Sequence, residues 1–207
     1  MADLQSSLAE SQESLESVIK EEVFRMYQEV ADHPENEFHF YHGREAAEMF
    51  GYRPEWLARA PAGAVASFAG VGNPHERSRL QPGETVLDLG SGAGLDSIIA
   101  GWQVGPTGRV LGIDLNPAMC RKAEAHAAQS GTVMECREGR MEEIPVPDRS
   151  VDVVLSNGVI NLSFRKRRVV QEIYRVLRPG GRISITDIVS AKQLSQSIVN
   201  DPKLWAS

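Results

Sequence analysis

Residues 86–96, with the sequence VLDLGSGAGLD, constrain this chain more than any other stretch. The first four are apolar except for Asp88, which is typical of a buried strand, and residues 95–103 have the character of a helix. The three glycines between them let the backbone approach a ligand that a Cβ atom would keep away. A strand, a glycine-rich turn and a helix N-terminus together form a corner that can bind a nucleotide.

A second acidic residue, Asp114, follows at the end of the next predicted strand, twenty residues after Gly94. An acid at this distance from a glycine turn can accept hydrogen bonds from both ribose hydroxyls of an adenosine. The dinucleotide fingerprint G-x-G-x-x-G/A needs a small residue at position 95, where this chain has Leu95. The pattern therefore favours an adenosine ligand and disfavours a nicotinamide cofactor.

From residue 81 onward, apolar strand segments alternate with helical segments. Strands are predicted at 85–89, 109–113, 133–137, 151–155 and 182–188, and helices at 95–103, 117–130 and 166–177. Strands separated by helices imply an α/β fold with a doubly wound, mainly parallel Rossmann-like sheet. About 19 residues follow the fifth strand, too few for a helix and two more strands, so a terminal hairpin is expected to be missing. The resulting open edge favours either a shortened chain or a homodimer.

The remaining segments flank this core. Residues 1–13 are polar and are expected to form a flexible tail. Residues 14–80 are expected to form an N-terminal helical cap that contributes to the substrate site, starting with an amphipathic helix that ends near Pro34. The adenosine-binding core is placed at 81–190. Residues 191–207 are expected to be a C-terminal helix or the start of a truncated region.

Composition excludes several classes of function. The net charge of −6 argues against a nucleic-acid-binding surface, and no apolar run reaches the 18 residues of a membrane span. The N-terminus has no basic and apolar regions of a signal peptide, so a cytoplasmic location is expected. Cys120 and Cys136 are then expected to be reduced, as small buried hydrophobic residues. No cluster of residues suggests a metal site.

The pattern D-x-G-x-G-x-G at 88–94 resembles the first motif of the class I S-adenosylmethionine-dependent methyltransferases. Further segments resemble the arsenite methyltransferase family, and SNGVINL is the most specific of them. They are YHG at 41–43, GVGNP at 70–74, PGETVLDLGSGAG at 82–94, SNGVINL at 156–162, RVLRPGG at 175–181 and DPKLW at 201–205. The similarity covers nearly all of the chain from residue 18 onward.

This resemblance implies a methyltransferase that uses S-adenosyl-L-methionine, leaves S-adenosyl-L-homocysteine, and transfers the methyl group in line to a small-molecule acceptor. It needs no metal, nucleic acid or membrane. The residues expected to bind the cofactor are Asp88, Gly90, Ser91, Gly92, Gly94, Asp114, Leu115, Arg140, Met141 and Asn157.

The chain departs from the arsenite methyltransferase family at two positions. The family has cysteines that hold trivalent arsenic where this chain has Val71 and Gly158. A soft, thiophilic ion needs thiolates, and Cys120 and Cys136 do not replace the missing ones by their position in the sequence. These departures argue against arsenite as the acceptor. A carbon, oxygen or nitrogen acceptor competes with it, and so does a cofactor-binding module without turnover.

Candidate catalytic residues come from the cap and from the ends of the last two strands. Tyr41 is expected in a lid over the cofactor, and His42 is a candidate general base because imidazole titrates near neutral pH. The alternative for His42 is packing among the neighbouring aromatic residues. Asn157 is expected to orient the acceptor or to bind loop backbone instead. Asp187, at the end of the fifth strand, is a second candidate base.

Overall fold

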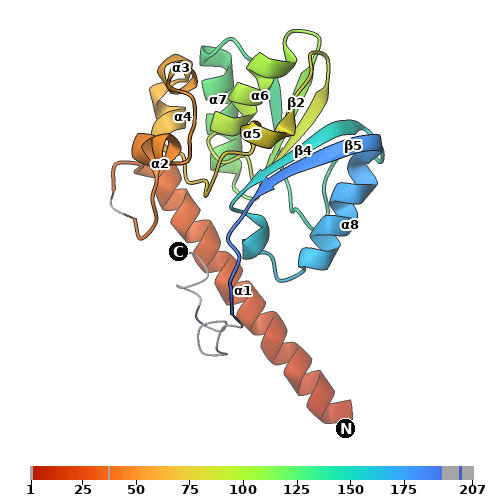
Figure 1. Ribbon diagram of the computed structural model, residues 1–207. Coiled ribbons are helices and arrows are strands. Elements are labelled where there is room, and N and C mark those ends of the chain that lie inside the picture. The colour runs from red at the N-terminus through yellow and green to blue at the C-terminus, as the bar shows by residue number, and fades with distance from the viewer. Residues whose placement is uncertain (1, 37, 193–200, 202–207) are drawn as a thin grey trace.

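The computed structural model describes residues 2–36, 38–192 and 201 (Figure 1). The sheet consists of β1 (Thr85–Leu89), β2 (Arg109–Asp114), β3 (Met134–Glu138), β4 (Val151–Asn157) and β5 (Leu177–Thr186). The helices are α1 (Ala2–Asp32), α2 (Gly43–Met49), α3 (Pro54–Arg59), α4 (Ala62–Ala66), α5 (His75–Ser78), α6 (Leu95–Val104), α7 (Pro117–Gln129) and α8 (Lys166–Val176), with a 3₁₀ turn, η1, at Ile160–Leu162.

The five strands form one parallel sheet in the order β3-β2-β1-β4-β5. The predicted doubly wound α/β fold is therefore confirmed. The central strand β1 is buried from Val86 to Leu89, as expected for a parallel strand covered on both faces. The direction of winding reverses between β1 and β4, and ligands of such sheets bind in the crevice at the carboxyl ends of these strands.

Helices cover both faces of the sheet (Figure 1). On one face, Val169, Ile173 and Val176 of α8 pack on Leu87 and Leu111. On the other face, apolar side chains of α6 pack on the alternate residues of β1, β2 and β4. The segment between α1 and β1 adds a further apolar cluster beside α6, in which Tyr52, Leu57 and Phe68 contact Leu95 and Ile99.

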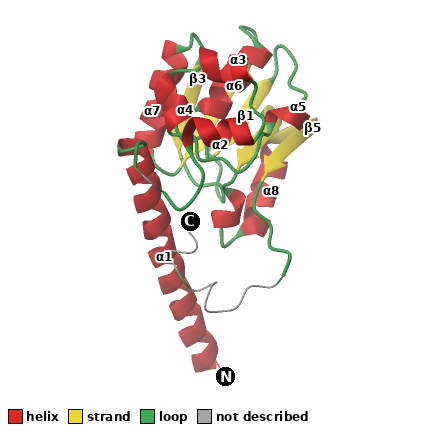
Figure 2. Cartoon of the chain, turned by 60° about the vertical axis from the view of Figure 1, so that its left-hand side comes forward, coloured by secondary structure: helices red, strands yellow, loops and turns green. Residues whose placement is uncertain are grey.

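The N-terminal helix begins earlier than the sequence analysis expected. Residues 2–13, expected as a flexible tail, form the first turns of α1. Ala, Leu, Gln and Glu are strong helix formers, and the segment contains neither Gly nor Pro, so nothing stops the helix from extending toward the N-terminus. The N-terminal part of α1 projects away from the sheet (Figure 2).

The last strand is also placed differently. It was expected at 182–188 after a turn, but β5 runs from Leu177 to Thr186, and Asp187 follows its end. Its pairing with β4 shifts register between Val151 and Val153, which absorbs the Pro-Gly-Gly segment as an irregularity. An edge strand tolerates Pro179 because one side of its backbone has no partner strand. The segment 191–207, predicted to be a C-terminal helix or the start of a truncated region, lies almost entirely outside the described residues.

Candidate functional site

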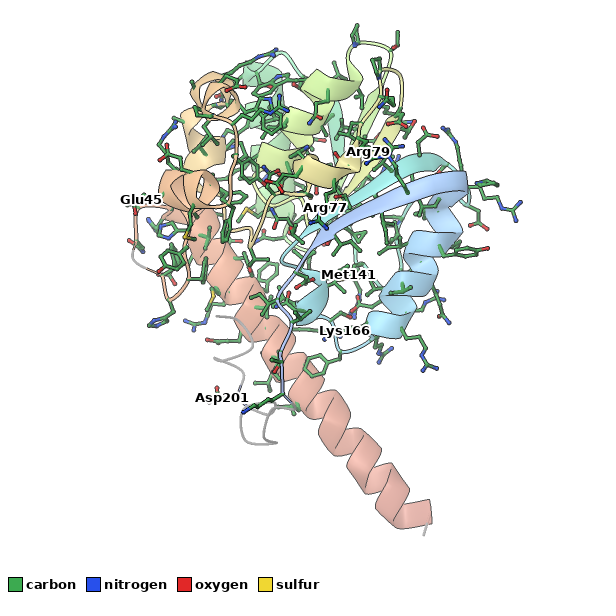
Figure 3. The ribbon with its side chains drawn as sticks, in the orientation of Figure 1. Glu45, Arg77, Arg79, Met141, Lys166 and Asp201 are labelled. Carbon is green, nitrogen blue, oxygen red and sulfur yellow. The ribbon has the colours of Figure 1, made fainter. Side chains whose placement is uncertain are left out.

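A cavity of about 580 Å³ lies at the carboxyl ends of the strands. Its walls come from the glycine turn after β1, the end of β2, the loop after β3 and the loop after β4. One side is formed by α1, through Val23, Phe24 and Tyr27. Met141, labelled in Figure 3, belongs to the wall contributed by the loop after β3. The cavity thus occupies the crevice at which ligands of doubly wound sheets bind.

Three glycines shape the turn after β1, all with positive φ: +70° at Gly90, +50° at Gly92 and +93° at Gly94. A Cβ atom on Gly90 would lie 2.4 Å from Cγ1 of Val159, and one on Gly94 would lie 3.0 Å from Ala123 of α7. A Cβ atom on Gly92 would have no protein atom within 4 Å. Gly92 therefore presents bare backbone to open space, as close approach of a ligand requires.

Asp114 is tied to this turn. One carboxylate oxygen accepts a hydrogen bond from the Gly92 backbone N–H (2.9 Å), and the other accepts one from the Asn116 N–H (2.8 Å). Burial raises the pKa of the Asp114 carboxyl, and its backbone hydrogen bonds oppose that rise. A carboxylate has about four lone-pair sites, so the group keeps acceptor capacity beyond its backbone hydrogen bonds. The side-chain amide of Asn116 donates to Gln28 of α1 (2.9 Å), which links α1 to the site.

The cavity is acidic. Burial and the nearby charge of Asp96 raise the pKa of Asp88 to about 7, while a hydrogen bond from the Ser97 hydroxyl (2.6 Å) opposes this. The cavity wall also carries two basic side chains, Lys20 and Arg140. Such a lining suits a positively charged ligand. The acidic lining residues are Glu21, Asp88, Asp96, Asp114, Glu138 and Glu142.

All the residues predicted to bind the cofactor line this cavity. They are Asp88, Gly90, Ser91, Gly92, Gly94, Asp114, Leu115, Arg140, Met141 and Asn157. The bare backbone at Gly92 and the acceptor sites of Asp114 fit an adenosine with a ribose diol, and the acidic lining fits a sulfonium. Their contacts with S-adenosylmethionine stay a prediction.

Asn157 lies at the end of β4, and both the oxygen and the nitrogen of its side-chain amide form hydrogen bonds within the protein. Its oxygen accepts hydrogen bonds from the N–H groups of Val71 (2.9 Å) and Gly72 (3.2 Å) and from the Thr186 hydroxyl (2.8 Å). Its nitrogen donates to the Gly72 carbonyl (2.9 Å) and to Asp96 (3.0 Å). The amide is thus occupied by the 70–74 loop and its surroundings. This favours the alternative in which Asn157 binds loop backbone and positions the site.

Asp96 joins Asn157 to a buried polar network. It accepts hydrogen bonds from the Tyr52 hydroxyl (2.5 Å) and pairs with Nε2 of His75 (3.0 Å), whose other ring nitrogen faces the amide of Gln103 (2.9 Å). The His75 side chain is fully buried. The network anchors the cap segment on the N-terminus of α6, next to the cavity.

Positions 71 and 158, at which the sequence departs from the arsenite methyltransferase pattern, face each other. A Cβ atom built on Gly158 would lie 3.1 Å from Cγ1 of Val71. Two cysteines at these positions would bring their sulfur atoms together, whereas this chain offers one isopropyl group. Neither Cys120 nor Cys136 lines the cavity.

The other three candidate catalytic residues do not line the cavity. Tyr41 is 71% exposed, and the ring of His42 packs edge-on against Phe38, with 5.0 Å between ring centroids. Asp187 accepts hydrogen bonds from the backbone N–H groups of Asn161 (3.1 Å) and Ile188 (2.8 Å). None of the three belongs to the cavity lining. The proposed lid at Tyr41 and the proposed base at His42 are therefore not placed at the site, because the aromatic residues of their segment pack against α1. The carboxylate of Asp187 is occupied by backbone N–H groups instead.

Sequence reasoning missed the contribution of α1. Lys20, Val23, Phe24 and Tyr27 all line the cavity, and burial raises the pKa of Tyr27 to about 12. Their spacing of three and four residues places them on one face of the helix. The sequence predicts an amphipathic helix here, but periodicity does not reveal what a helix packs against.

Within the described part of the chain, no three His, Cys, Asp or Glu side chains are grouped so that they could hold a metal ion. None of its helices combines the length and the apolar character that crossing a bilayer requires.

Comparison with known proteins gives the same assignment. Residues 80–207 match the family model described as "Methyltransferase domain". The arsenite methyltransferase of Halobacterium salinarum is 44% identical over 157 residues, which are 75% of this chain and 40% of that protein. The ubiquinone/menaquinone biosynthesis C-methyltransferase of Hydrogenovibrio crunogenus is 33% identical over 121 residues, 57% of this chain and 47% of that protein.

A solved structure agrees. The arsenic (III) S-adenosylmethionine methyltransferase of Chlamydomonas reinhardtii is 37% identical, with a TM-score of 0.66 over 72% of this chain and 53% of that one. The chain spans only about 40% of the length of the first curated relative. Because the family model spans more than half of its residues, and the parallel sheet carries the glycine turn at its switch point, the chain belongs to the methyltransferase-domain family, in the class I group that depends on S-adenosylmethionine.

Proposed function

We propose that this chain transfers a methyl group from S-adenosylmethionine to a small-molecule acceptor, in the manner of the arsenite methyltransferases. The observation that carries the proposal is the pairing of bare backbone at Gly92 with the carboxylate of Asp114, 2.9 Å apart, inside an acidic cavity. When bound, S-adenosylmethionine supplies an electrophilic methyl group on a positively charged sulfur.

The residues of the cavity have separate tasks in this proposal. Asp114 accepts hydrogen bonds from the ribose hydroxyls, and Met141 covers the adenine ring. The carboxylates of Asp88 and Asp96 favour the cationic end of the ligand. Apolar side chains from α1 and from the loop after β4, such as Phe24 and Val159, exclude water from the methyl-transfer region. The chain thus contributes alignment and exclusion of water, which in-line methyl transfer needs most.

The acceptor is proposed to be a carbon, oxygen or nitrogen nucleophile. Val71 and Gly158 face each other where two thiolates would be needed, and a soft trivalent ion gains little from an isopropyl group. Val159 and Leu162, which follow Gly158 in the sequence, add apolar surface to the cavity. The similarity to a C-methyltransferase of quinone biosynthesis is consistent with an acceptor of low polarity.

A screen with isotopically labelled S-adenosylmethionine tests this proposal. Arsenite, phenols, quinols, amines and small thiols are offered to the full chain, and methylated products are identified by mass spectrometry. We expect transfer to one of the organic classes and none to arsenite. Efficient methylation of arsenite by the unmodified chain would contradict the proposed acceptor class.

A variant sharpens the result. Val71→Cys combined with Gly158→Cys introduces two facing thiols and is expected to create a binding site for trivalent arsenicals between the 70–74 loop and the end of β4. The left-handed backbone at Gly158, with φ at +74°, adds strain to the second substitution, so folding is checked by circular dichroism.

A cofactor-binding module without turnover is the remaining alternative. Tight donor binding without transfer to any acceptor would support it.

We also propose that the edge of β5, which pairs with no second strand among the described residues, pairs with a second copy of the chain. Ile183 and Ile185 of this edge strand are 53% and 39% exposed, and an unpaired apolar edge is a template for strand pairing. We expect light scattering to show a dimer, and Ile183→Lys to shift it toward the monomer. A wild-type chain that stays monomeric at high concentration would contradict this arrangement.

A cytoplasmic location completes the proposal. Both cysteines are free in the structure, as expected of a protein in a reducing compartment.

A further inference from the structure

His75 is a buried histidine that faces a carboxylate of the cavity. It is the first residue of α5, and its side chain is fully buried. Its Nε2 is 3.0 Å from Oδ1 of Asp96, which lines the cavity in the first turn of α6. The rings of Tyr52 and Trp56 pack edge-on against the imidazole, with 6.2 and 5.6 Å between ring centroids. The imidazole therefore has a fixed position behind the cavity wall.

The hydrogen-bond partners of the ring fix the position of its proton. Nδ1 of His75 is 2.9 Å from the side-chain nitrogen of Gln103, and the same nitrogen donates to the Ile99 carbonyl (3.4 Å). An amide nitrogen only donates, so Nδ1 accepts and the ring proton lies on Nε2. This N–H donates to Asp96. The imidazole is thus neutral, and it orients the carboxylate without cancelling its negative charge.

Three side chains hold the carboxylate of Asp96. Oδ1 accepts hydrogen bonds from the Tyr52 hydroxyl and from His75, and Oδ2 accepts one from the Asn157 amide (3.0 Å). A carboxylate has about four lone-pair sites, so these three donors leave it capacity for a ligand. Because all three donors are neutral, they fix the direction of the carboxylate and leave its charge available to a cation in the cavity.

Asp96 and Asp114 lie on opposite sides of the glycine turn. The turn follows β1, which is flanked by β2, ending at Asp114, and by β4, ending at Asn157. The hydrogen bond to Asn157 places Asp96 on the β4 side. The two flanking strands are about 10 Å apart, which is two strand spacings. A nucleoside whose ribose binds Asp114 can therefore extend its amino-acid end across the turn toward Asp96.

We propose that His75 is a positioning residue for the methyl donor: it holds the carboxylate of Asp96 in the orientation that binds the ammonium group of the donor's amino-acid end. The inference rests on the proposed function, since it takes S-adenosylmethionine as the ligand. His75 does not line the cavity, so its effect on the ligand passes through Asp96. Without the Nε2–H, Oδ1 loses a donor and the carboxylate is free to turn away from the ligand.

Two ligands separate the parts of the cofactor. S-adenosylhomocysteine carries the amino-acid end, whereas 5′-methylthioadenosine has the same thioadenosine without it. His75→Leu removes the donor and keeps an apolar side chain in the buried position. We expect this variant to bind S-adenosylhomocysteine at least ~10-fold more weakly, as for the loss of a hydrogen bond to a charged group, and 5′-methylthioadenosine within about twofold of wild type. Isothermal titration calorimetry measures both affinities.

The comparison of the two ligands distinguishes positioning from general damage. An equal loss of affinity for both would show that His75 has a structural role only. Unchanged affinity for both would show that Asp96 does not depend on His75. Either result would overturn the inference. A wild-type chain that binds neither ligand would contradict the proposed function, and with it this inference.

A double-mutant cycle tests the route through Asp96. Asp96→Asn removes the negative charge and is expected to weaken binding of S-adenosylhomocysteine by itself. Adding His75→Leu to this variant is then expected to change the affinity by less than about twofold, because residues that act through one another are not additive. Additive losses in the double variant would show that His75 acts by another route.

His75→Gln and His33→Leu are the controls. The side-chain nitrogen of a glutamine can replace Nε2 as the donor, so His75→Gln is expected to keep the affinity for S-adenosylhomocysteine within about threefold. The His33 side chain is 63% exposed, and its replacement is expected to leave both affinities within about twofold. A glutamine variant as impaired as His75→Leu would contradict the role of the hydrogen bond.

A measurement on the wild-type chain does not depend on the folding of any variant. NMR of nitrogen-labelled histidine reports which ring nitrogen carries the proton, and the signal of His75 is the one that is lost in His75→Gln. At pH 7 we expect a neutral ring with its proton on Nε2. A doubly protonated ring, or a proton on Nδ1 alone, would overturn the inference.

Discussion

Asp114 combines two functions in one side chain. It accepts backbone hydrogen bonds from Gly92 and Asn116, which orders the turn, and it lines the cavity. The same carboxylate thus builds the site and is proposed to bind the ribose hydroxyls of the cofactor. Substitution of Asp114 can therefore affect both ligand binding and folding, so a matched control variant is needed to tell the two effects apart.

Asp114→Ala is expected to weaken the affinity for S-adenosylhomocysteine by at least ~100-fold. Two charge-assisted hydrogen bonds to the ribose are lost, each worth ~1.5–3 kcal/mol. Isothermal titration calorimetry measures the change. Glu55→Ala removes the same charge from an exposed position on α3 and is expected to leave the affinity within about twofold. Unchanged binding by the Asp114 variant would place the ligand elsewhere.

Asp88 makes the stability of the folded chain depend on pH. Its pKa of about 7 in the folded chain lies above the value near 4 of an unfolded Asp, so the folded state holds an extra proton between these limits. The stability contributed by this group is present below pH 4 and is lost as the pH rises through 7.

Asp88→Asn removes that pH dependence. Between pH 5 and 8, the melting temperature of the variant is expected to fall less than that of the wild type, and at pH 8 the variant is expected to be the more stable protein. Thermal unfolding followed by circular dichroism across this range measures the difference. Parallel curves for the two proteins would show that Asp88 is not the titrating group.

At the scale of elements, Asn157 joins the end of β4 to the loop at 70–74 and to Asp96 of α6. Asn157→Ala is expected to lower the free energy of unfolding by about 3 kcal/mol, since several buried backbone groups lose their partner. Chemical denaturation gives the value. Asn36→Ala removes an exposed amide bonded to Glu29 (3.2 Å) and is expected to cost less than ~0.5 kcal/mol. Equal losses in the two variants would contradict the anchoring role.

At the scale of the whole molecule, Arg182 connects β5 to the start of β1. Its guanidinium donates to the Glu84 carboxylate (2.6 and 2.7 Å) and to the carbonyls of Ser78 and Arg79 (2.7 Å each). Arg182→Ala is expected to destabilise the fold by about 2 kcal/mol, less than a fully buried pair because the side chain is one-third exposed.

The control for this prediction is the exposed pair Arg109–Glu135. Arg109→Ala breaks an ion pair of 2.8 Å between side chains that are 59% and 42% exposed, and is expected to cost under ~1 kcal/mol. Urea denaturation compares the two variants. A larger loss for the Arg109 variant would contradict the structural role of Arg182.

Much of this architecture could be predicted from the sequence because its signals are local. The strand, the turn and the acid at Asp114 lie within 30 residues, and each is specified by its neighbours. The directions in which the side chains of the cap point depend on contacts with residues that are distant in the sequence. Tyr41 and His42 were placed at the site by sequence proximity to the cap, but the aromatic cluster with α1 decides where they point. The start of β5 depends equally on its partner, Val151 of β4.

The acidic lining of the cavity has a consequence for inhibition by the spent cofactor. S-adenosylhomocysteine lacks the positive charge on sulfur, so the carboxylates attract it less than they attract the fresh donor. For the proposed methyl transfer, the by-product is therefore expected to bind more weakly than the fresh donor, and added salt, which screens charges, is expected to narrow this difference. The acidic residues of the cavity wall would then reduce competition by the spent cofactor.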